Sequence, residues 1–151
     1  MKLKIPPVIV VVFCAFLMWS LDRYVLPEYS MIFSGQRILS MVAFVACMSV
    51  MLLALNIFRK QKTTVDPMQP SKASSLVDNG IFKVSRNPMY LAMLLLLIGW
   101  AIKLGNPFGA VVLVLFAWYM TQFQIKPEEE ALTEIFGKQY QKYCEKVRRW
   151  V

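Results

Sequence analysis

The sequence predicts an all-α integral membrane helical bundle with four transmembrane helices and a C-terminal amphipathic cytoplasmic helix. Hydrophobic residues make up 58% of the 151 residues and charged residues only 17%. A soluble domain averages roughly 45–50% apolar and about 25% charged residues. The apolar residues also fall in long uncharged runs, and a bilayer core about 30 Å thick needs roughly 17–25 such residues per helix. At this length we expect a single domain, residues 1–151.

Four apolar runs define the expected spans. They cover about 5–26, 37–58, 87–104 and 107–125, and the third is the shortest. The first run follows two lysines, as a secretory signal would. The stretch 19–23 lacks a small-x-small cleavage pattern, so we expect the first span to be retained. Gly105-Asn106-Pro107 predicts a tight turn, which makes the last two helices antiparallel.

The distribution of basic residues predicts the topology. All of the 17 Lys and Arg residues except Arg23, Arg37 and Lys103 lie before the first span, between the second and third, or after the fourth. The positive-inside rule therefore places both termini and the segments 63–90 and 126–151 in the cytoplasm. The net charge of +8 then reflects topology and attraction to anionic membrane lipids. We expect no nucleic-acid partner, because the basic residues flank the spans and form no separate module.

The absence of histidine limits the possible chemistry. With no His in the chain, Ser-His-Asp and Cys-His nucleophile arrangements and His metal sites are excluded. Cys14, Cys47 and Cys144 are too few and too scattered for a disulfide framework or a Cys-only zinc site. We therefore expect no metal, and no residue stands out as a general base or nucleophile.

A polar cluster precedes the third span. After a turn at Asp78-Asn79-Gly80, the chain reads Arg86-Asn87-Pro88-Met89-Tyr90. A side-chain cap from Asn87 and a proline at the first helical position predict that the span begins at Asn87. The Arg86 guanidinium suits a carboxylate or phosphate. Taken one by one, these residues also fit a helix cap, a topology signal and an interfacial tyrosine.

A second polar cluster follows the fourth span. Pro127 and Glu128-Glu129-Glu130 predict the start of a new helix, because acidic residues are favoured in a first turn. The carboxylates either only balance the helix dipole or bind ribose hydroxyls or an ammonium group. Apolar residues then recur in steps of three and four and predict one amphipathic helix at the cytoplasmic interface. Gly137 interrupts this helix, and we expect a close backbone approach there.

The order and spacing of these pieces resemble the isoprenylcysteine carboxyl methyltransferase and phospholipid methyltransferase superfamily of small membrane enzymes. The similarity covers roughly residues 63–151. It is carried by Leu76-Val77, Gly80-x-Phe82, Arg86-Asn87-Pro88-Met89-Tyr90, Glu128-Glu129-x-x-Leu132-x-x-x-Phe136-Gly137-x-x-Tyr140-x-x-Tyr143 and the closing Arg149-Trp150. The first two spans carry no signature of their own.

The resemblance implies a site for S-adenosylmethionine at the cytoplasmic face. One wall would consist of Arg86, Asn87, Pro88 and Tyr90, and the other of Glu128 and Glu129. The approach would be shaped by Leu76, Val77, Gly80 and Phe82. In this interpretation Arg86 pairs with the cofactor carboxylate and one glutamate binds its ribose or ammonium group. Tyr90 packs on the adenine or the sulfonium, since a ring face attracts a cation.

The implied function is methyl transfer from S-adenosylmethionine to a lipid-like or apolar acceptor that enters from the bilayer. Three positions depart from the pattern of many relatives: Asn87 replaces a His, Ala92 a Gly and Asp78 a Thr. Two alternatives stay open, namely an NADPH-dependent membrane lipid or sterol-type reductase and a non-catalytic membrane subunit. The identity of the acceptor is not indicated by the sequence.

Overall fold

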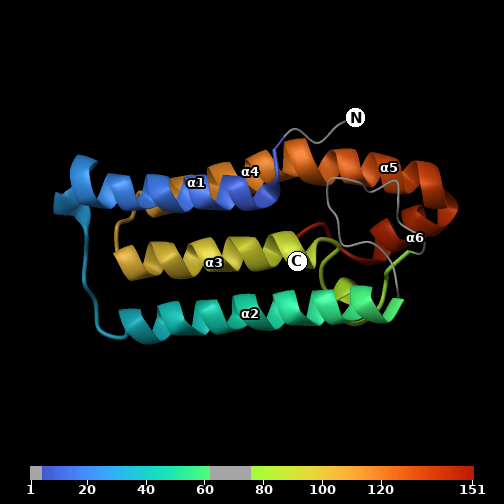
Figure 1. The fold of residues 1–151 in the computed structure, drawn as a ribbon, viewed down its shortest axis with the longest axis horizontal. Coiled ribbons are helices and arrows are strands. Elements are labelled where there is room, and N and C mark those ends of the chain that lie inside the picture. The colour runs from blue at the N-terminus through green and yellow to red at the C-terminus, as the bar shows by residue number, and fades with distance from the viewer. Residues whose placement is uncertain (1–4, 62–75) are drawn as a thin grey trace.

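The computed structural model describes residues 5–61 and 76–151, and all regular elements in this part of the chain are helical (Figure 1). The long elements are α1 (Pro7–Ser20), α2 (Gln36–Gln61), α3 (Pro88–Leu104), α4 (Gly109–Met120), α5 (Lys126–Phe136) and α6 (Lys138–Lys146). The short ones are the π turns η1 (Leu21–Val25) and η5 (Thr121–Ile125) and the 3-10 turns η2 (Pro27–Tyr29) and η4 (Gly80–Lys83). Lys2, Lys4, Lys62, Lys72 and the 63–75 part of the expected cytoplasmic segment lie outside the described residues.

Within residues 5–61 and 76–151, three helices are long and apolar enough to cross a membrane. They run over Pro7–Val25, Gln36–Lys60 and Gly109–Phe136. The α3 helix is apolar as well, but its 17 residues make it shorter than these three. The helical fold class is thereby confirmed for the described residues, whereas a membrane crossing by α3 stays a prediction.

The helices form an elongated bundle in which α3 is the central element (Figure 1). The α2 helix packs along α3, and α1 contacts both α3 and α4. Gly99 of α3 permits a close approach to α2, because a Cβ there would lie 2.9 Å from Cε1 of Phe44. Small residues at such contacts are typical of helices that pack inside membranes.

The turn between α3 and α4 is present where the sequence predicts it. Gly105 ends α3 with φ of +76°, a left-handed conformation that glycine adopts without strain. Asn106 Oδ1 accepts a 3.1 Å hydrogen bond from the backbone N–H of Phe108. The side-chain amide of Asn106 donates to the Leu26 carbonyl at 2.9 Å, so the turn is also tied to the end of α1. The turn makes α3 and α4 antiparallel, as expected, and α4 begins at Gly109.

Pro127 does not begin a new helix, contrary to the prediction. The chain stays helical from Gly109 to Phe136, and the π turn η5 lies between α4 and α5. A proline inside an α-helix clashes with the carbonyl four residues earlier and removes one hydrogen bond. A π turn directly before Pro127 widens the helix at that carbonyl, which lets the helix continue past the proline.

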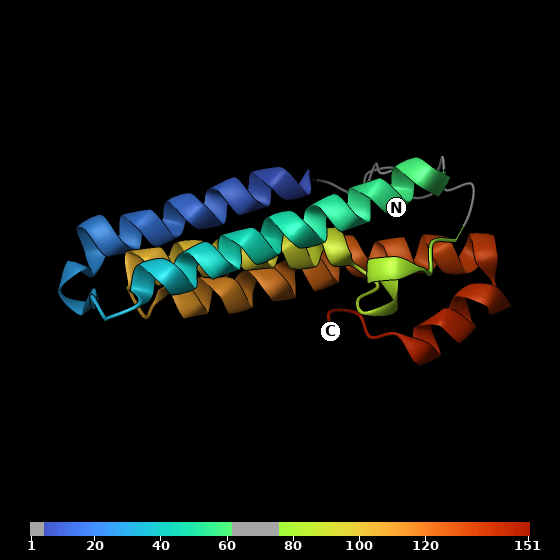
Figure 2. The same ribbon diagram turned by 90° about the horizontal axis from the view of Figure 1, so that it is seen from below.

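The amphipathic C-terminal region also differs from the prediction, because two helices replace the expected one. The chain reverses at Gly137, and α6 lies back against the bundle end (Figure 2). A Cβ at Gly137 would meet nothing within 4 Å, so the expected close backbone approach is wrong. The glycine is needed there for its φ of +52°, which side chains with a Cβ rarely adopt.

The residues predicted to form the site gather at one end of the bundle. The end of α2, the start of α3, α5 and α6 all lie at this end in both ribbon views (Figures 1 and 2). They share a buried apolar cluster that includes Ala54 of α2, Val77 and Phe82 before α3, and Tyr140 and Tyr143 of α6. The expectation that segments far apart in sequence meet at one end of the bundle is thereby met. The compartment that this end faces stays a prediction.

Candidate functional site

An ion-pair cluster joins the two predicted walls of the site. Nη1 of Arg86, just before α3, lies 3.2 Å from Oε1 of Glu129 in α5. Arg149, near the end of the chain, donates from Nε to Oε1 of the same carboxylate at 2.9 Å and from Nη2 to Oε2 at 2.7 Å. This two-pronged geometry fixes both the direction and the rotation of the carboxylate. The Arg86 and Glu129 side chains are only 11% and 17% exposed, which limits screening of the pair by solvent.

A second contact between the walls joins Tyr90 of α3 to Glu128 of α5. The Tyr90 hydroxyl donates a 2.5 Å hydrogen bond to Oε1 of Glu128. Tyr90 is 4% exposed and belongs to the apolar core between α1, α3 and α4. Packing of the Tyr90 ring in the core therefore fixes the position of its hydroxyl at the bundle end.

Asn87 precedes α3 as predicted, but its side chain does not cap the helix. No side-chain capping bond forms, and Nδ2 instead donates to the Arg149 carbonyl at 2.9 Å. Pro88 occupies the first helical position, where the missing N–H removes no intrahelical bond. Ser85, fully buried, accepts from the Asn87 N–H at 3.1 Å. The amide of Asn87 thus ties the start of α3 to the end of the chain.

The four residues predicted to shape the approach lie at the apolar bundle end, in or next to the turn η4. Val77 and Phe82 are buried among the apolar residues of the bundle end, and Leu76 packs against them. Phe82 meets Phe58 of α2 edge to face, with ring centroids 5.2 Å apart. Gly80 has φ of +56°, and a Cβ there would lie 2.5 Å from Cδ1 of Ile57. Their contacts tie the η4 segment to α2 and to the apolar cluster of the bundle end.

Two tyrosines of α6 hold the η4 segment in place. Tyr143 donates from its hydroxyl to the Phe82 carbonyl at 2.6 Å. Burial raises the pKa of Tyr143 and of Tyr140 above the usual range, so both phenols stay protonated at neutral pH. Cys144, the residue after Tyr143 in α6, contacts Nη1 of Arg86 through its sulfur. Through these contacts, α6 fixes both the turn before α3 and the Arg86 side chain.

Three residues of the cluster were not among the residues predicted to form the cofactor site: Ser85, Cys144 and Arg149. The closing Arg149-Trp150 pair was part of the family pattern, and that was the signal that could have found Arg149. Ser85 and Cys144 carried no signal, because their roles depend on contacts with Asn87 and Arg86 that only the fold creates.

The charge balance of the cluster favours one further anionic partner. Two guanidinium groups face one carboxylate in Glu129, which leaves an excess positive charge at this point. Nε of Arg86 is buried and has no hydrogen-bond partner among the described residues. A buried donor without a partner is costly, so an acceptor such as a ligand carboxylate suits this position. Within residues 5–61 and 76–151, no group of three or more His, Cys, Asp or Glu side chains is arranged to hold a metal ion.

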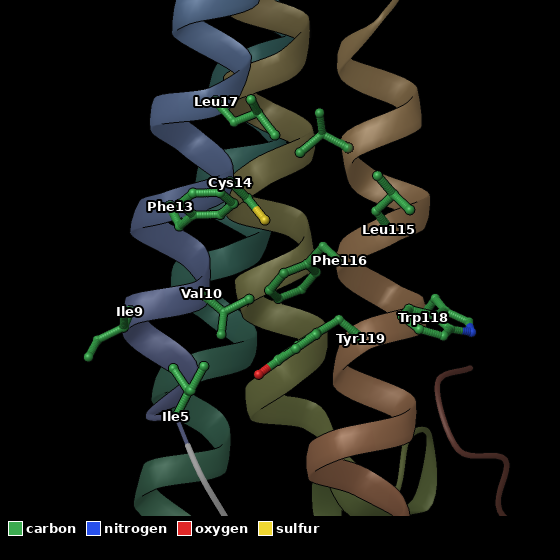
Figure 3. Close-up of a pocket in the computed structure, with 11 residues that line it drawn as sticks. Ile5, Ile9, Val10, Phe13, Cys14, Leu17, Leu115, Phe116, Trp118 and Tyr119 are labelled. Carbon is green, nitrogen blue, oxygen red and sulfur yellow. The ribbon is translucent and has the colours of Figure 1, made fainter.

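An apolar groove lies between α1 and α4 (Figure 3). Its volume is about 480 Å³. Figure 3 shows Val10, Phe13, Phe116 and Tyr119 directed into the space between the two helices. None of the predicted cofactor-site residues lines this groove, so it is distinct from the polar cluster at the bundle end.

The chain matches a known protein family over most of its length. The family model described as phospholipid methyltransferase matches residues 31–139, which include both walls of the cluster but not Arg149. The chain belongs to the phospholipid methyltransferase family. The resemblance stated from the sequence motifs is thereby confirmed.

Individual relatives of this phospholipid methyltransferase family member match over shorter stretches. An uncharacterized protein of Haemophilus influenzae is 43% identical over 63 residues, which cover 42% of this chain and all of that protein. The protein-S-isoprenylcysteine O-methyltransferase B of Arabidopsis thaliana is 32% identical over 72 residues, 48% of this chain and 36% of its own. The Saccharomyces cerevisiae protein-S-isoprenylcysteine O-methyltransferase is 35% identical over 72 residues, 48% of this chain and 30% of its own. The match thus spans about a third of these two methyltransferases.

Proposed function

We propose that this chain is an S-adenosylmethionine-dependent membrane methyltransferase that acts on a lipid-like or membrane-accessible acceptor. The observation that carries the proposal is the meeting of Arg86, Tyr90, Glu128 and Glu129, from both walls, at one end of an apolar bundle. Membership of the phospholipid methyltransferase family and the similarity to isoprenylcysteine methyltransferases support methyl transfer as the reaction.

The contacts of the cluster support distinct roles for its charged residues. Arg86 is the group for the cofactor carboxylate, since its buried Nε has no partner among the described residues and its surroundings carry excess positive charge. Both oxygens of Glu129 are occupied by arginines. Glu128 accepts only from Tyr90 within the described part of the chain, and through one oxygen. Glu128 is therefore the carboxylate for the ribose hydroxyls or the ammonium group.

In this reaction the main task of the protein is to bind the cofactor and the acceptor and to orient them. When bound, S-adenosylmethionine supplies a methyl group that its sulfonium has already activated. Holding two reactants in line is by itself worth several powers of ten in rate. Tyr90 contributes a hydroxyl that orients the Glu128 carboxylate, and the packing of its ring in the core holds that hydroxyl in place. A chain without histidine is compatible with this mode of catalysis.

The groove between α1 and α4 is proposed to hold the hydrocarbon part of the acceptor. It lies between two helices that are apolar enough to cross a membrane, and its lining is apolar. Ile5, at one end of the groove, accepts a 2.6 Å hydrogen bond through its carbonyl from Nε2 of Gln124. Gln124 lies about one helical turn before Glu128. An acceptor chain in the groove would therefore have its polar end near the cluster.

Isothermal titration of the detergent-purified protein tests the proposal. We expect S-adenosylhomocysteine, the product form of the cofactor, to bind to the wild type and to bind more weakly to Arg86→Ala and Glu128→Ala. Unchanged affinity in both variants would refute the assigned site. Binding of NADPH in place of S-adenosylhomocysteine would refute the proposal in favour of a reductase. Binding of neither compound would refute it in favour of a non-catalytic subunit.

A further inference from the structure

The last residues of the chain form a strap across the two walls of the site. Val147 is extended and buried in the apolar cluster of the bundle end. Trp150 packs against the core between α1, α3 and α4, and its indole N–H donates to Thr121 Oγ1 at 3.2 Å. Thr121 belongs to the π turn η5. The segment between these two anchors therefore spans from α6 to the junction of α4 and α5.

Main-chain groups of this strap hold the start of α3. The Arg148 carbonyl accepts from the backbone N–H of Arg86 at 3.1 Å. The Arg149 carbonyl accepts from the side-chain amide of Asn87 at 2.9 Å. Both acceptors lie where the backbone leads into α3, so the strap fixes the origin of the Arg86 side chain as well as the helix start.

The side chain of Arg149 acts on the opposite wall. It grips both oxygens of Glu129, and this contact raises the pKa of the guanidinium further. Glu129 in turn faces Arg86 at 3.2 Å. Without Arg149, the Glu129 carboxylate would be free to rotate and would form a tighter pair with Arg86. The group proposed for the cofactor carboxylate would then be neutralised by the protein itself.

We propose that the strap, residues 147–150, is part of the cofactor site, and that Arg149 is a positioning residue that acts through Glu129 to keep Arg86 available. The inference rests on the proposed function. The match to the family model ends at residue 139, before the strap begins. The role of Arg149 follows from its contacts with Glu129 and with Asn87.

The test compares S-adenosylhomocysteine affinity, measured by isothermal titration, with the melting temperature of each variant. Arg149→Ala should weaken binding by about tenfold or more, since a hydrogen bond to a charged group contributes about 1.5–3 kcal/mol. Arg149→Lys keeps the charge but loses the planar fork, and it should recover only part of the affinity. Lys146→Ala, at an exposed position of α6, removes a charge nearby and should bind within about twofold of the wild type.

A double variant separates positioning from general stabilisation. If Arg149 acts through Glu129, Arg149→Ala combined with Glu129→Gln should bind no more weakly than Glu129→Gln alone. Additive losses, or Arg149→Ala binding within twofold of a wild type that binds, would overturn this inference and leave the proposed function standing. Absence of binding by the wild type would overturn the proposed function and this inference with it. Arg149→Lys serves the same comparison if the alanine variant does not fold.

Discussion

The hydroxyl of Tyr90 donates a 2.5 Å hydrogen bond to Oε1 of Glu128, and this bond links the start of α3 to α5 across 38 residues of sequence. The tyrosine ring belongs to the apolar core, whereas the carboxylate belongs to the polar bundle end. The position of one proposed ligand of the cofactor is therefore set by packing inside the bundle. Substitutions that break this hydrogen bond should therefore lower the affinity for the cofactor while the fold is retained.

Tyr90→Phe removes the hydrogen bond and keeps the ring. We expect a several-fold loss of S-adenosylhomocysteine affinity, because Glu128 loses the donor that orients it, and a stability loss of about 1–2 kcal/mol. Titration calorimetry and thermal melting measure the two effects. Tyr24→Phe is the matched control, since Tyr24 is 69% exposed. Equal affinities of Tyr90→Phe and the wild type would contradict the assigned role.

Glu128→Gln tests the charge of this carboxylate separately from its hydrogen bond. The amide oxygen still accepts from Tyr90, so the melting temperature should change little. The affinity for S-adenosylhomocysteine should fall by about tenfold, because hydrogen bonds with a charged partner are roughly twice as strong as neutral ones. Glu130→Gln, two residues along and exposed, should bind like the wild type. A similar loss in both variants would instead indicate a general effect of charge at the start of α5.

Val10→Trp fills the groove between α1 and α4 (Figure 3). The indole should compete with the acceptor's hydrocarbon chain, so we expect KM for a farnesylated cysteine or for phosphatidylethanolamine to rise several-fold. The affinity for S-adenosylhomocysteine should stay the same. Val12→Trp, at a position 62% exposed and outside the groove, should leave KM unchanged. An unchanged KM in Val10→Trp would exclude the groove as the acceptor site.

Gly105→Ala tests the turn between α3 and α4. A Cβ at this position would overlap the carbonyl oxygen of Met31 and lie 2.9 Å from Nε2 of Gln36. Gly35 also has positive φ, but its Cβ would meet nothing within 4 Å. Gly35→Ala therefore reports the strain of the left-handed backbone alone, about 1–2 kcal/mol. Thermal melting should show a clearly larger loss for Gly105→Ala, and equal losses would argue against the close contact.

Much of the fold could be predicted because it depends on local properties. The uncharged runs predict α1, α2 and α4, and Gly105-Asn106 predicts the turn before α4. The start of α3 follows from Pro88, whose ring suits the first helical position and no interior one. These features depend on residues that are neighbours in sequence, so the sequence shows them directly.

The parts that failed depend on contacts between distant residues. Asn87 has the chemistry of a helix cap, but the Arg149 carbonyl lies within its reach and takes the amide instead. Pro127 has the chemistry of a helix start, but the π turn before it lets the helix continue. For Asn87 a contact with the end of the chain outweighs the local preference, and for Pro127 the irregular turn before it does so.

The π turn at Thr121–Ile125 also governs the direction of everything that follows it. One residue in an α-helix corresponds to a rotation of about 100°, and a π turn accommodates one extra residue without breaking the helix. Shortening this turn by a single residue would swing Glu128 and Glu129 around the helix axis, away from Tyr90 and Arg86. The direction in which Glu128 and Glu129 point is therefore set by the π turn that precedes them in the helix.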